Sequence, residues 1–355
     1  MTRRIALERA RAVVGSRWFR LTVRVVIGGG VLVAIVARVG AGPFLHGLQS
    51  LNGAAIGAAV VLAAIATAAA AWRWQLIARR LGVGLGWPTA VGMYYQSQFL
   101  NTVLPGGVIG DVQRAVGHGR RADSVRMAAR AVAVERAVGQ VVQLGIAVVI
   151  VMLFGAEFEG VLFPAIGVVL VVLAVAAVAA AWASIRVRRV LRHEVDELRA
   201  GLGSPAVAIQ AVAASVVVVC CHVATFAVAT FAVGIDVPPL RLLTLAIVVL
   251  LAASIPFNIG GWGPREGVAG WAFAVAGFGA AAGVSAATLF GVLAILSVVP
   301  GVIVARLASL ITRRSHRDRQ ALRDPQLRDL PRRVPRQRRP AEARPLERSG
   351  LRSGG

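Results

Sequence analysis

Three groups of polar and charged side chains lie inside stretches of the sequence that are otherwise apolar, within residues 94–114, 135–143 and 258–266. Arginine guanidinium groups and helix N-termini both favour phosphate oxygens, and nearby carboxylates can balance the arginines or accept an amine. The predicted chemistry is therefore the binding of an amphipathic, phosphate-bearing headgroup. The candidate binding residues are Gln98, Asn101, Pro105, Gly110, Asp111, Arg114, Glu135, Arg136, Gln140, Asn258, Gly260, Gly261, Arg265 and Glu266.

The spacing of these residues places several of them on common helix faces. In the first group, four residues recur at i, i+4, i+7 and i+11, and Asp111 and Arg114 follow a glycine turn. In the second group, three residues recur at i, i+4 and i+7, which is again one face of a helix. The two series are Tyr94, Gln98, Asn101, Pro105 and Arg136, Gln140, Gln143.

Structural roles for the same residues remain open alternatives. Glu135 and Arg136 could pair with other helices purely for packing, and the Pro/Gly stretches could be kinks or close helix contacts. Polar residues within a membrane are costly and mark functional sites by default. Broken helices are tolerated at membrane depth only beside protein or a water-filled cavity. We therefore favour a binding cavity.

The elements that would position these groups are membrane-spanning helices. Of the 355 residues, 57% are hydrophobic and 15% are charged, whereas soluble proteins have about 45–50% apolar and about 25% charged residues. The predicted fold is all-α, a polytopic integral membrane protein with about 6–8 transmembrane helices. The apolar runs long enough to span are residues 21–39, 54–71, 128–154, 161–184, 205–233 and 284–305.

The arginine distribution predicts the orientation of the chain. All 39 basic residues are arginine, against 16 acidic residues. Arginine-rich loops face the cytoplasm, so both termini are expected inside a bacterial-type cell membrane. Arg73, between Trp72 and Trp74, is interpreted as part of the cytoplasmic interface. The predicted external loops are 40–53, 155–160 and 234–239, and the predicted cytoplasmic segments are the N-terminus, 114–130, 186–199 and the tail.

Two apolar stretches are interrupted by Pro and Gly. Residues 87–112 have arginine-rich flanks on both sides, so they are predicted to enter and leave the membrane on the cytoplasmic side. Between the external loop 234–239 and the tail, the number of crossings must be odd. Either three segments cross, or residues 240–279 form a re-entrant hairpin, which the short segment 267–279 favours. Such paired interruptions are typical of transporters with discontinuous helices.

Other classes of function have little support in the sequence. The arginines lie between apolar runs and in the tail, which indicates topology and contact with anionic lipids, and no nucleic-acid binding is predicted. Cys220 and Cys221 are adjacent, which disfavours a disulfide framework or a metal site. The sequence carries no nucleotide-hydrolysis, zinc-protease or nucleophile-elbow motif. No cofactor and no enzymatic activity are predicted.

Three motifs resemble those of one family. Residues 98–114, QFLNTVLPGGVIGDVQR, look like the signature of the lysylphosphatidylglycerol synthase transmembrane-region family, also called flippase-like. The Glu135-Arg136 pair resembles its E-R pair, and residues 255–267, IPFNIGGWGPREG, resemble its G-G-x-G-x-R-E-G element. The resemblance covers about residues 10–310 in the family's order. It implies the lipid-translocating membrane part, without the aminoacyl-transferase domain of full-length synthases.

Three regions are expected: a basic cytoplasmic N-terminus (1–20), a flippase-like transmembrane domain (21–308) and a disordered, arginine-rich cytoplasmic tail (309–355). The predicted function is to bind and translocate an anionic or isoprenoid-linked phospholipid across the cytoplasmic membrane. The predicted partners are membrane lipids, with a homo-oligomer or a separate envelope enzyme as further candidates.

Two alternative functions stay open. One is a membrane-embedded transferase that uses the carboxylates of Asp111, Glu135 and Glu266 as acid–base groups. The other is an accessory subunit of an envelope-lipid glycosyltransferase.

Overall fold

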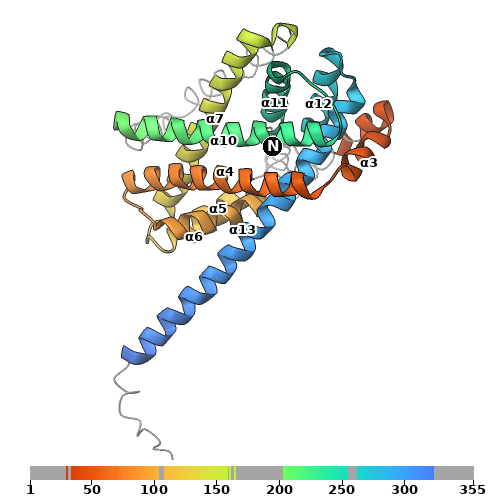
Figure 1. The fold of residues 1–355 in the computed structure, drawn as a ribbon. Coiled ribbons are helices and arrows are strands. Elements are labelled where there is room, and N and C mark those ends of the chain that lie inside the picture. Colours follow the sequence, from red (N-terminus) through yellow and green to blue (C-terminus); the bar gives the residue numbers. More distant parts are fainter. Residues whose placement is uncertain are drawn as a thin grey trace, which may run out of the picture. The chain divides into compact units, whose positions relative to one another are not determined.

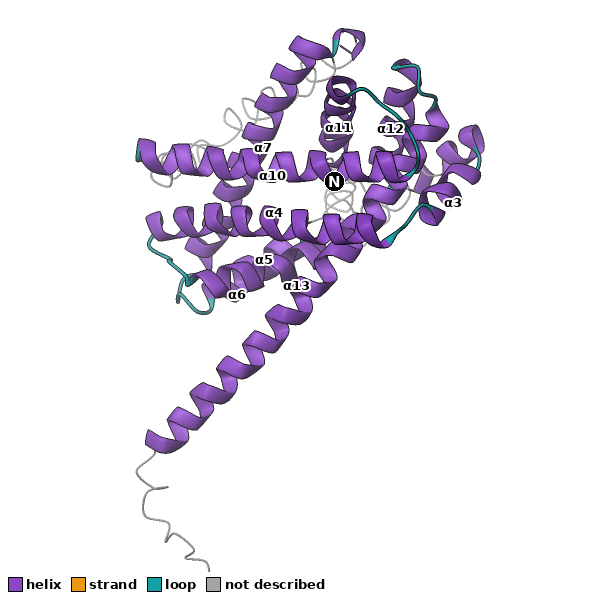
Figure 2. Ribbon diagram, in the orientation of Figure 1, coloured by secondary structure: helices purple, strands orange, loops and turns teal. Residues whose placement is uncertain are grey.

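The computed structural model describes residues 29–30, 33–103, 108–158, 160, 164, 203–254 and 262–323. Its regular elements are α-helices, as the hydrophobic pattern predicted (Figures 1 and 2). In chain order they are α3 (Gly42–Gln49), α4 (Gly53–Arg80), α5 (Trp87–Val103), α6 (Ile109–Gly119), α7 (Val125–Phe154), α10 (Pro205–Ala232), α11 (Pro239–Ala253), α12 (Pro264–Val275) and α13 (Ala280–Arg323).

Four of the described helices are long and apolar enough to cross a membrane, namely α4, α7, α10 and the Ala280–Gly301 part of α13. Their 22 to 30 residues correspond to about 33–45 Å at 1.5 Å per residue, and a hydrocarbon core is about 30 Å thick. They coincide with four of the predicted apolar runs and confirm a polytopic membrane protein. Of the other two runs, 161–184 lies outside the described residues except at position 164, and 21–39 is described mainly over 33–39.

The ends of these helices follow from local sequence. The side chain of Asn52 accepts a hydrogen bond from the Ala55 N–H at 2.9 Å and so caps α4. Ser124 caps α7 in the same way through the Met127 N–H, at 3.4 Å. Helices α10, α11 and α12 begin with proline, whose missing N–H costs nothing in the first turn.

Both predicted interruptions separate two short helices that pack against each other. Helix α5 has 17 residues and α6 has 11, and residues 104–107 between them lie outside the described residues. Helices α11 and α12 have 15 and 12 residues, and residues 255–261 between them are likewise outside. Helix α5 packs on α6, and α11 packs on α12. Eleven or twelve residues span only about 16–18 Å, so α6 and α12 are too short to cross the membrane.

Helix α3 was not expected within the predicted external loop 40–53. Pro43 in its first turn favours the helix. The Ser285 hydroxyl on α13 donates to the Pro43 carbonyl at 2.9 Å, and a ring nitrogen of His46 lies 3.2 Å from the Val233 carbonyl. These contacts with residues distant in sequence hold α3 in place, which explains why the local pattern did not reveal it.

The chain divides into two compact units, Met1–Ala308 and Ser309–Gly355. Helix α13 continues to Arg323, so the first residues of the tail expected to be disordered are helical. Residues 324–355 lie outside the described residues. All of the polar sites described below belong to the first unit.

Buried hydrophobic side chains of the first unit form two main clusters. One joins α10, α11, α12 and α13 and includes Phe226, Phe273 and Leu289. The other joins α4, α5 and α7 and includes Trp74 and Ile77. The second cluster forms the apolar surroundings of the charged residues that follow.

The predicted orientation can be tested at the α6–α7 connection. In a background with Cys220 and Cys221 replaced by alanine, a cysteine placed at Arg120 is expected to react only with membrane-permeant thiol reagents in intact cells, because the arginine-rich loop should be cytoplasmic. A cysteine in the predicted external segment 40–53 should react with impermeant reagents. External labelling at position 120 would contradict a re-entrant α5–α6 segment.

Candidate functional site

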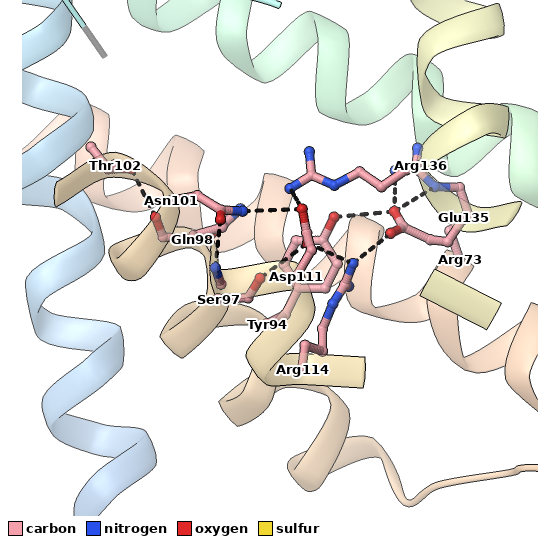
Figure 3. Close-up of polar contacts among 11 residues, drawn as sticks. Arg73, Tyr94, Ser97, Gln98, Asn101, Thr102, Asp111, Arg114, Glu135 and Arg136 are labelled. Atoms are coloured by element: carbon pink, nitrogen blue, oxygen red, sulfur yellow. Dashed lines mark hydrogen bonds and ion pairs between the residues drawn. The ribbon is translucent and has the colours of Figure 1, made fainter. Parts of the chain in front are cut away.

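Glu135 on α7 is the centre of a buried ionic cluster (Figure 3). Its side chain is fully buried. Oε1 accepts hydrogen bonds from Arg73 Nη2 at 2.5 Å, from Arg73 Nε at 3.2 Å and from the Tyr94 hydroxyl at 3.1 Å. Oε2 accepts from Arg114 Nη2 at 2.8 Å. One carboxylate therefore ties together α4, α5, α6 and α7.

Arg114 on α6 is fully buried between two aromatic rings. Its guanidinium carbon lies 4.6 Å from the centroid of a Trp74 ring and 4.3 Å from that of Tyr94. The same Nη2 that reaches Glu135 also donates to Asp111 Oδ1 at 3.1 Å. Nε and Nη1 of Arg114 are buried too, and no group among the described residues accepts a hydrogen bond from them. Two strong donors are therefore still available.

Asp111 lies at the more accessible side of the cluster. Arg136 Nη2 pairs with Asp111 Oδ2 at 2.6 Å, and 43% of the Arg136 side chain is exposed, against 13% for Asp111. The Ser97 hydroxyl donates to Oδ1 at 3.1 Å, and Asn101 Nδ2 donates to Oδ2 at 3.2 Å. Arg136 is thus the most accessible cation of the group. The ionic cluster, as the term is used below, consists of Arg73, Tyr94, Asp111, Arg114, Glu135 and Arg136.

Asn101 and Gly110 join the two sides of the interruption between α5 and α6. Asn101 Oδ1 accepts a hydrogen bond from the Gly110 N–H at 2.8 Å, while its amide donates to Asp111. Gly110 lies directly against the backbone of Ser97, where an added Cβ would collide with the Ser97 carbonyl. This close approach is what lets Asp111 reach both Ser97 and Asn101.

Replacing Gly110 with alanine is therefore expected to separate α5 from α6. The obstructing atoms are backbone, so the helices must move, and overpacking of this kind costs about 1–3 kcal/mol. Thermal unfolding of the purified protein in detergent measures the effect. The control is Gly145→Ala on α7, where nothing lies within 4 Å of the added Cβ. Equal stability of the two variants would contradict the close α5–α6 contact.

Arg73 was missed as a site residue. The sequence suggested a cytoplasmic interface arginine between two tryptophans, but the structure buries it, with 5% exposed. Besides binding Glu135, it donates from Nη1 to the Ser215 hydroxyl on α10 at 2.6 Å. Gly139 on α7 makes room for it, since a Cβ there would come within 2.9 Å of Arg73 Nη2. Gly139 one turn after Glu135 was the available signal, because it leaves a gap beside the carboxylate.

The ionic cluster contains three arginines and two carboxylates, and so carries one excess positive charge at neutral pH. Burying charges is costly unless they are paired and hydrogen-bonded. The two carboxylates pair with the three arginines, but one positive charge and two donor nitrogens of Arg114 are left without a partner among the described residues. A bound anion would neutralise the excess charge and accept those donors.

A second polar group lies at the start of α12. The Arg265 guanidinium pairs with the adjacent Glu266 through Nη2 and through Nε, the latter at 2.9 Å. Glu266 Oε2 also accepts from the Gly263 N–H at 2.7 Å, which caps the helix. Arg265 lies between the rings of Trp262 and Phe290, at 5.7 and 5.4 Å. This pair is electrically neutral, and its carboxylate has a clear structural role.

The structure brings together only part of the predicted site. Asn101, Gly110, Asp111, Arg114, Glu135 and Arg136 converge, and Gln98 lies beside them, accepting from the Thr67 hydroxyl at 2.8 Å. Gln140 is exposed. Among the described residues, no hydrogen bond or ion pair links Arg265 and Glu266 to the ionic cluster. The predicted site residues Pro105, Asn258, Gly260 and Gly261 lie outside the described residues.

Comparison with known proteins gives one match. A family model described as the lysylphosphatidylglycerol synthase TM region covers residues 21–301. No curated protein and no solved structure matches the chain. The matched range contains the whole ionic cluster and the Arg265–Glu266 pair.

Proposed function

Because the chain belongs to the lysylphosphatidylglycerol synthase transmembrane-region family, we propose that it binds a phosphate-bearing lipid and moves it between the leaflets of the cell membrane. In this proposal both termini face the cytoplasm, and the substrate is an anionic or isoprenoid-linked phospholipid. The sequence carries no nucleotide-hydrolysis motif, so movement is downhill or driven by an ion gradient.

The observation that carries this proposal is the excess positive charge of the ionic cluster. Arg114 is fully buried, and two of its donor nitrogens, Nε and Nη1, have no acceptor among the described residues. An unpaired buried donor is costly, and a phosphate oxygen is the acceptor that best suits a guanidinium group. Arg136, which is partly exposed, gives a headgroup its first contact with the cluster.

The state of the carboxylates favours lipid binding over acid–base catalysis. Glu135 accepts from two arginines and a tyrosine, and Asp111 is paired with two arginines. Glu266 is bound by Arg265 and caps its own helix. A general base must be free to take a proton from the substrate, whereas each of these carboxylates is already engaged. We therefore propose a transporter that is not an enzyme.

Leaflet exchange in reconstituted vesicles tests the proposal. Purified protein is inserted into vesicles that carry fluorescent phosphatidylglycerol, a fluorescent polyprenyl phosphate or fluorescent phosphatidylcholine, and a membrane-impermeant reductant quenches the outer leaflet. We expect faster exchange of an anionic lipid than of phosphatidylcholine, because the excess charge of the ionic cluster is positive. Exchange no faster than in protein-free vesicles, for every lipid, would overturn the proposal.

A further inference from the structure

A polar stripe runs along one face of α7 beyond the ionic cluster. It consists of Arg136, Gln140 and Gln143, at i, i+4 and i+7. Helix α7 is one of the membrane-length helices, so two amides in its middle need a reason, because polar groups are expensive in lipid. The contacts and the exposure differ among the three members of the stripe, and they indicate which of them a phosphate group could reach.

The first member, Arg136, connects the stripe to the ionic cluster. Its Nη2 holds Asp111 at 2.6 Å, while almost half of its side chain is exposed. Its Nε is buried, and no described residue accepts a hydrogen bond from it. Arg136 can therefore exchange one acceptor, the Asp111 carboxylate, for another of the same charge and similar shape, a phosphate.

The last member, Gln143, binds the end of α11. Its Nε2 donates to the Leu250 carbonyl and to the Ser254 hydroxyl, both at 3.1 Å. The last carbonyls of a helix have no partner within the helix, so this contact places polar backbone beside the stripe. One turn further along α7, Ala147 is buried against Val219 and Ile247, which closes this face of the helix.

Gln140 lies between these two ends and is exposed. The neighbouring Val141, with 69% exposed, occupies a different face of α7, as an apolar residue in contact with lipid should. An exposed amide on an otherwise apolar helix is expected where the helix lines a water-filled path. The stripe thus leads from Arg136, whose acceptor can be replaced, past the exposed amide of Gln140, to the polar C-terminal end of α11.

We propose that the Arg136–Gln140–Gln143 stripe lines part of the path along which the lipid phosphate crosses the membrane interior. This inference rests on the proposed function and adds the route to it. Phosphate oxygens leave Arg136, accept from the Gln140 amide, and reach the end of α11 beside Gln143. Neutral amides suit a path better than further arginines would, because each site along a path must bind weakly enough to release its ligand.

Gln140→Leu tests the route separately from the binding site. We expect leaflet exchange of phosphatidylglycerol to slow by about tenfold, the factor given by losing one hydrogen bond along the path. Binding of dihexanoyl phosphatidylglycerol to the detergent-solubilised protein should weaken much less than exchange slows, because the ionic cluster is intact. The matched control is Val141→Leu, one residue away on the exposed apolar face, with exchange as in the wild type. Wild-type exchange by Gln140→Leu would overturn the route.

Failure of the route and failure of the proposed function give different results. If the wild-type protein neither binds nor exchanges the anionic lipids, the proposed function itself is wrong. If the wild-type protein exchanges them and Gln140→Leu does so equally fast, only the route is wrong. A Gln140→Leu variant that loses binding as well would also count against the route, since residue 140 would then belong to the binding site.

Thiol accessibility provides a second test that does not depend on transport. In the background without Cys220 and Cys221, Gln140→Cys is expected to react with an anionic methanethiosulfonate, because a thiolate forms only where water is present. Val141→Cys should react much more slowly, and added dihexanoyl phosphatidylglycerol should protect position 140. Equal reactivity at the two positions, or an unreactive Gln140→Cys, would overturn the path.

Discussion

Replacing Glu135 with glutamine is expected to cause the largest loss of stability of any single substitution in the ionic cluster. Glu135 accepts from Arg73 and Arg114 in a fully buried position. The amide of glutamine removes the negative charge and places an NH2 donor against one of the two guanidinium groups. Breaking a buried ion pair by removing one partner costs about 3–5 kcal/mol. Thermal unfolding in detergent, with monodispersity followed by size-exclusion chromatography, measures the loss.

The control for this substitution is Glu157→Gln, at an exposed glutamate just beyond α7. It removes the same charge and should leave stability unchanged. The double variant Arg73→Met with Glu135→Gln should recover part of the loss, because it also removes one of the stranded positive charges. A Glu135→Gln variant as stable as the wild type would mean that Glu135 is not the common acceptor that holds the helices together.

The broken segments could be predicted from the sequence because their signals are local. Pro and Gly between residues 103 and 109 interrupt an apolar stretch, and the structure ends α5 at Val103 and begins α6 at Ile109. The i, i+7 spacing of Tyr94 and Asn101 likewise predicted side chains on a common face. Tyr94 belongs to the ionic cluster, and Asn101 donates to its Asp111. Helix periodicity fixes such relations before any tertiary packing is known.

Arg73 could not be identified in this way, because its role depends on the packing of α4 against α7 and α10. Its acceptors, Glu135 and Ser215, lie 62 and 142 residues away in the sequence. Within α4 its only neighbours of note are Trp72 and Trp74, which are equally typical of a membrane interface. Trp72 is 43% exposed and Trp74 is completely buried, so the two tryptophans that looked equivalent have different roles.

The role of the third predicted group, around Arg265 and Glu266, also could not be predicted from the sequence. Arg265 and Glu266 were expected to join the other charged residues in one cavity. The reason was that they follow a Pro/Gly interruption, as Asp111 and Arg114 do. In the described structure, Glu266 satisfies the Gly263 N–H and its own neighbour Arg265. A carboxylate at the third position of a helix caps that helix wherever the helix lies, so sequence alone does not distinguish a cap from a ligand.

Substituting Arg114 with lysine is expected to impair lipid handling although the positive charge is kept. The guanidinium of Arg114 binds Asp111 and Glu135 together and lies over the rings of Trp74 and Tyr94. An ammonium group is a compact, strongly hydrated point charge that fits neither the aromatic sandwich nor the two carboxylates. It also lacks the additional N–H donors that a phosphate would use. Losing one or two charge-assisted hydrogen bonds, each worth about 1.5–3 kcal/mol, should weaken lipid binding and slow exchange by about 10- to 100-fold or more.

The matched control for Arg114→Lys is Arg80→Lys, at an exposed arginine in the last turn of α4. Both variants keep the net charge, so any difference between them comes from the geometry around Arg114 and not from the surface potential. Binding of dihexanoyl phosphatidylglycerol and leaflet exchange are measured at equal expression and equal monodispersity. If Arg114→Lys binds and exchanges the lipid as the wild type does, the planar fork is not needed. The ionic cluster would then be a device for helix packing, and the phosphate would have to bind elsewhere in the matched region.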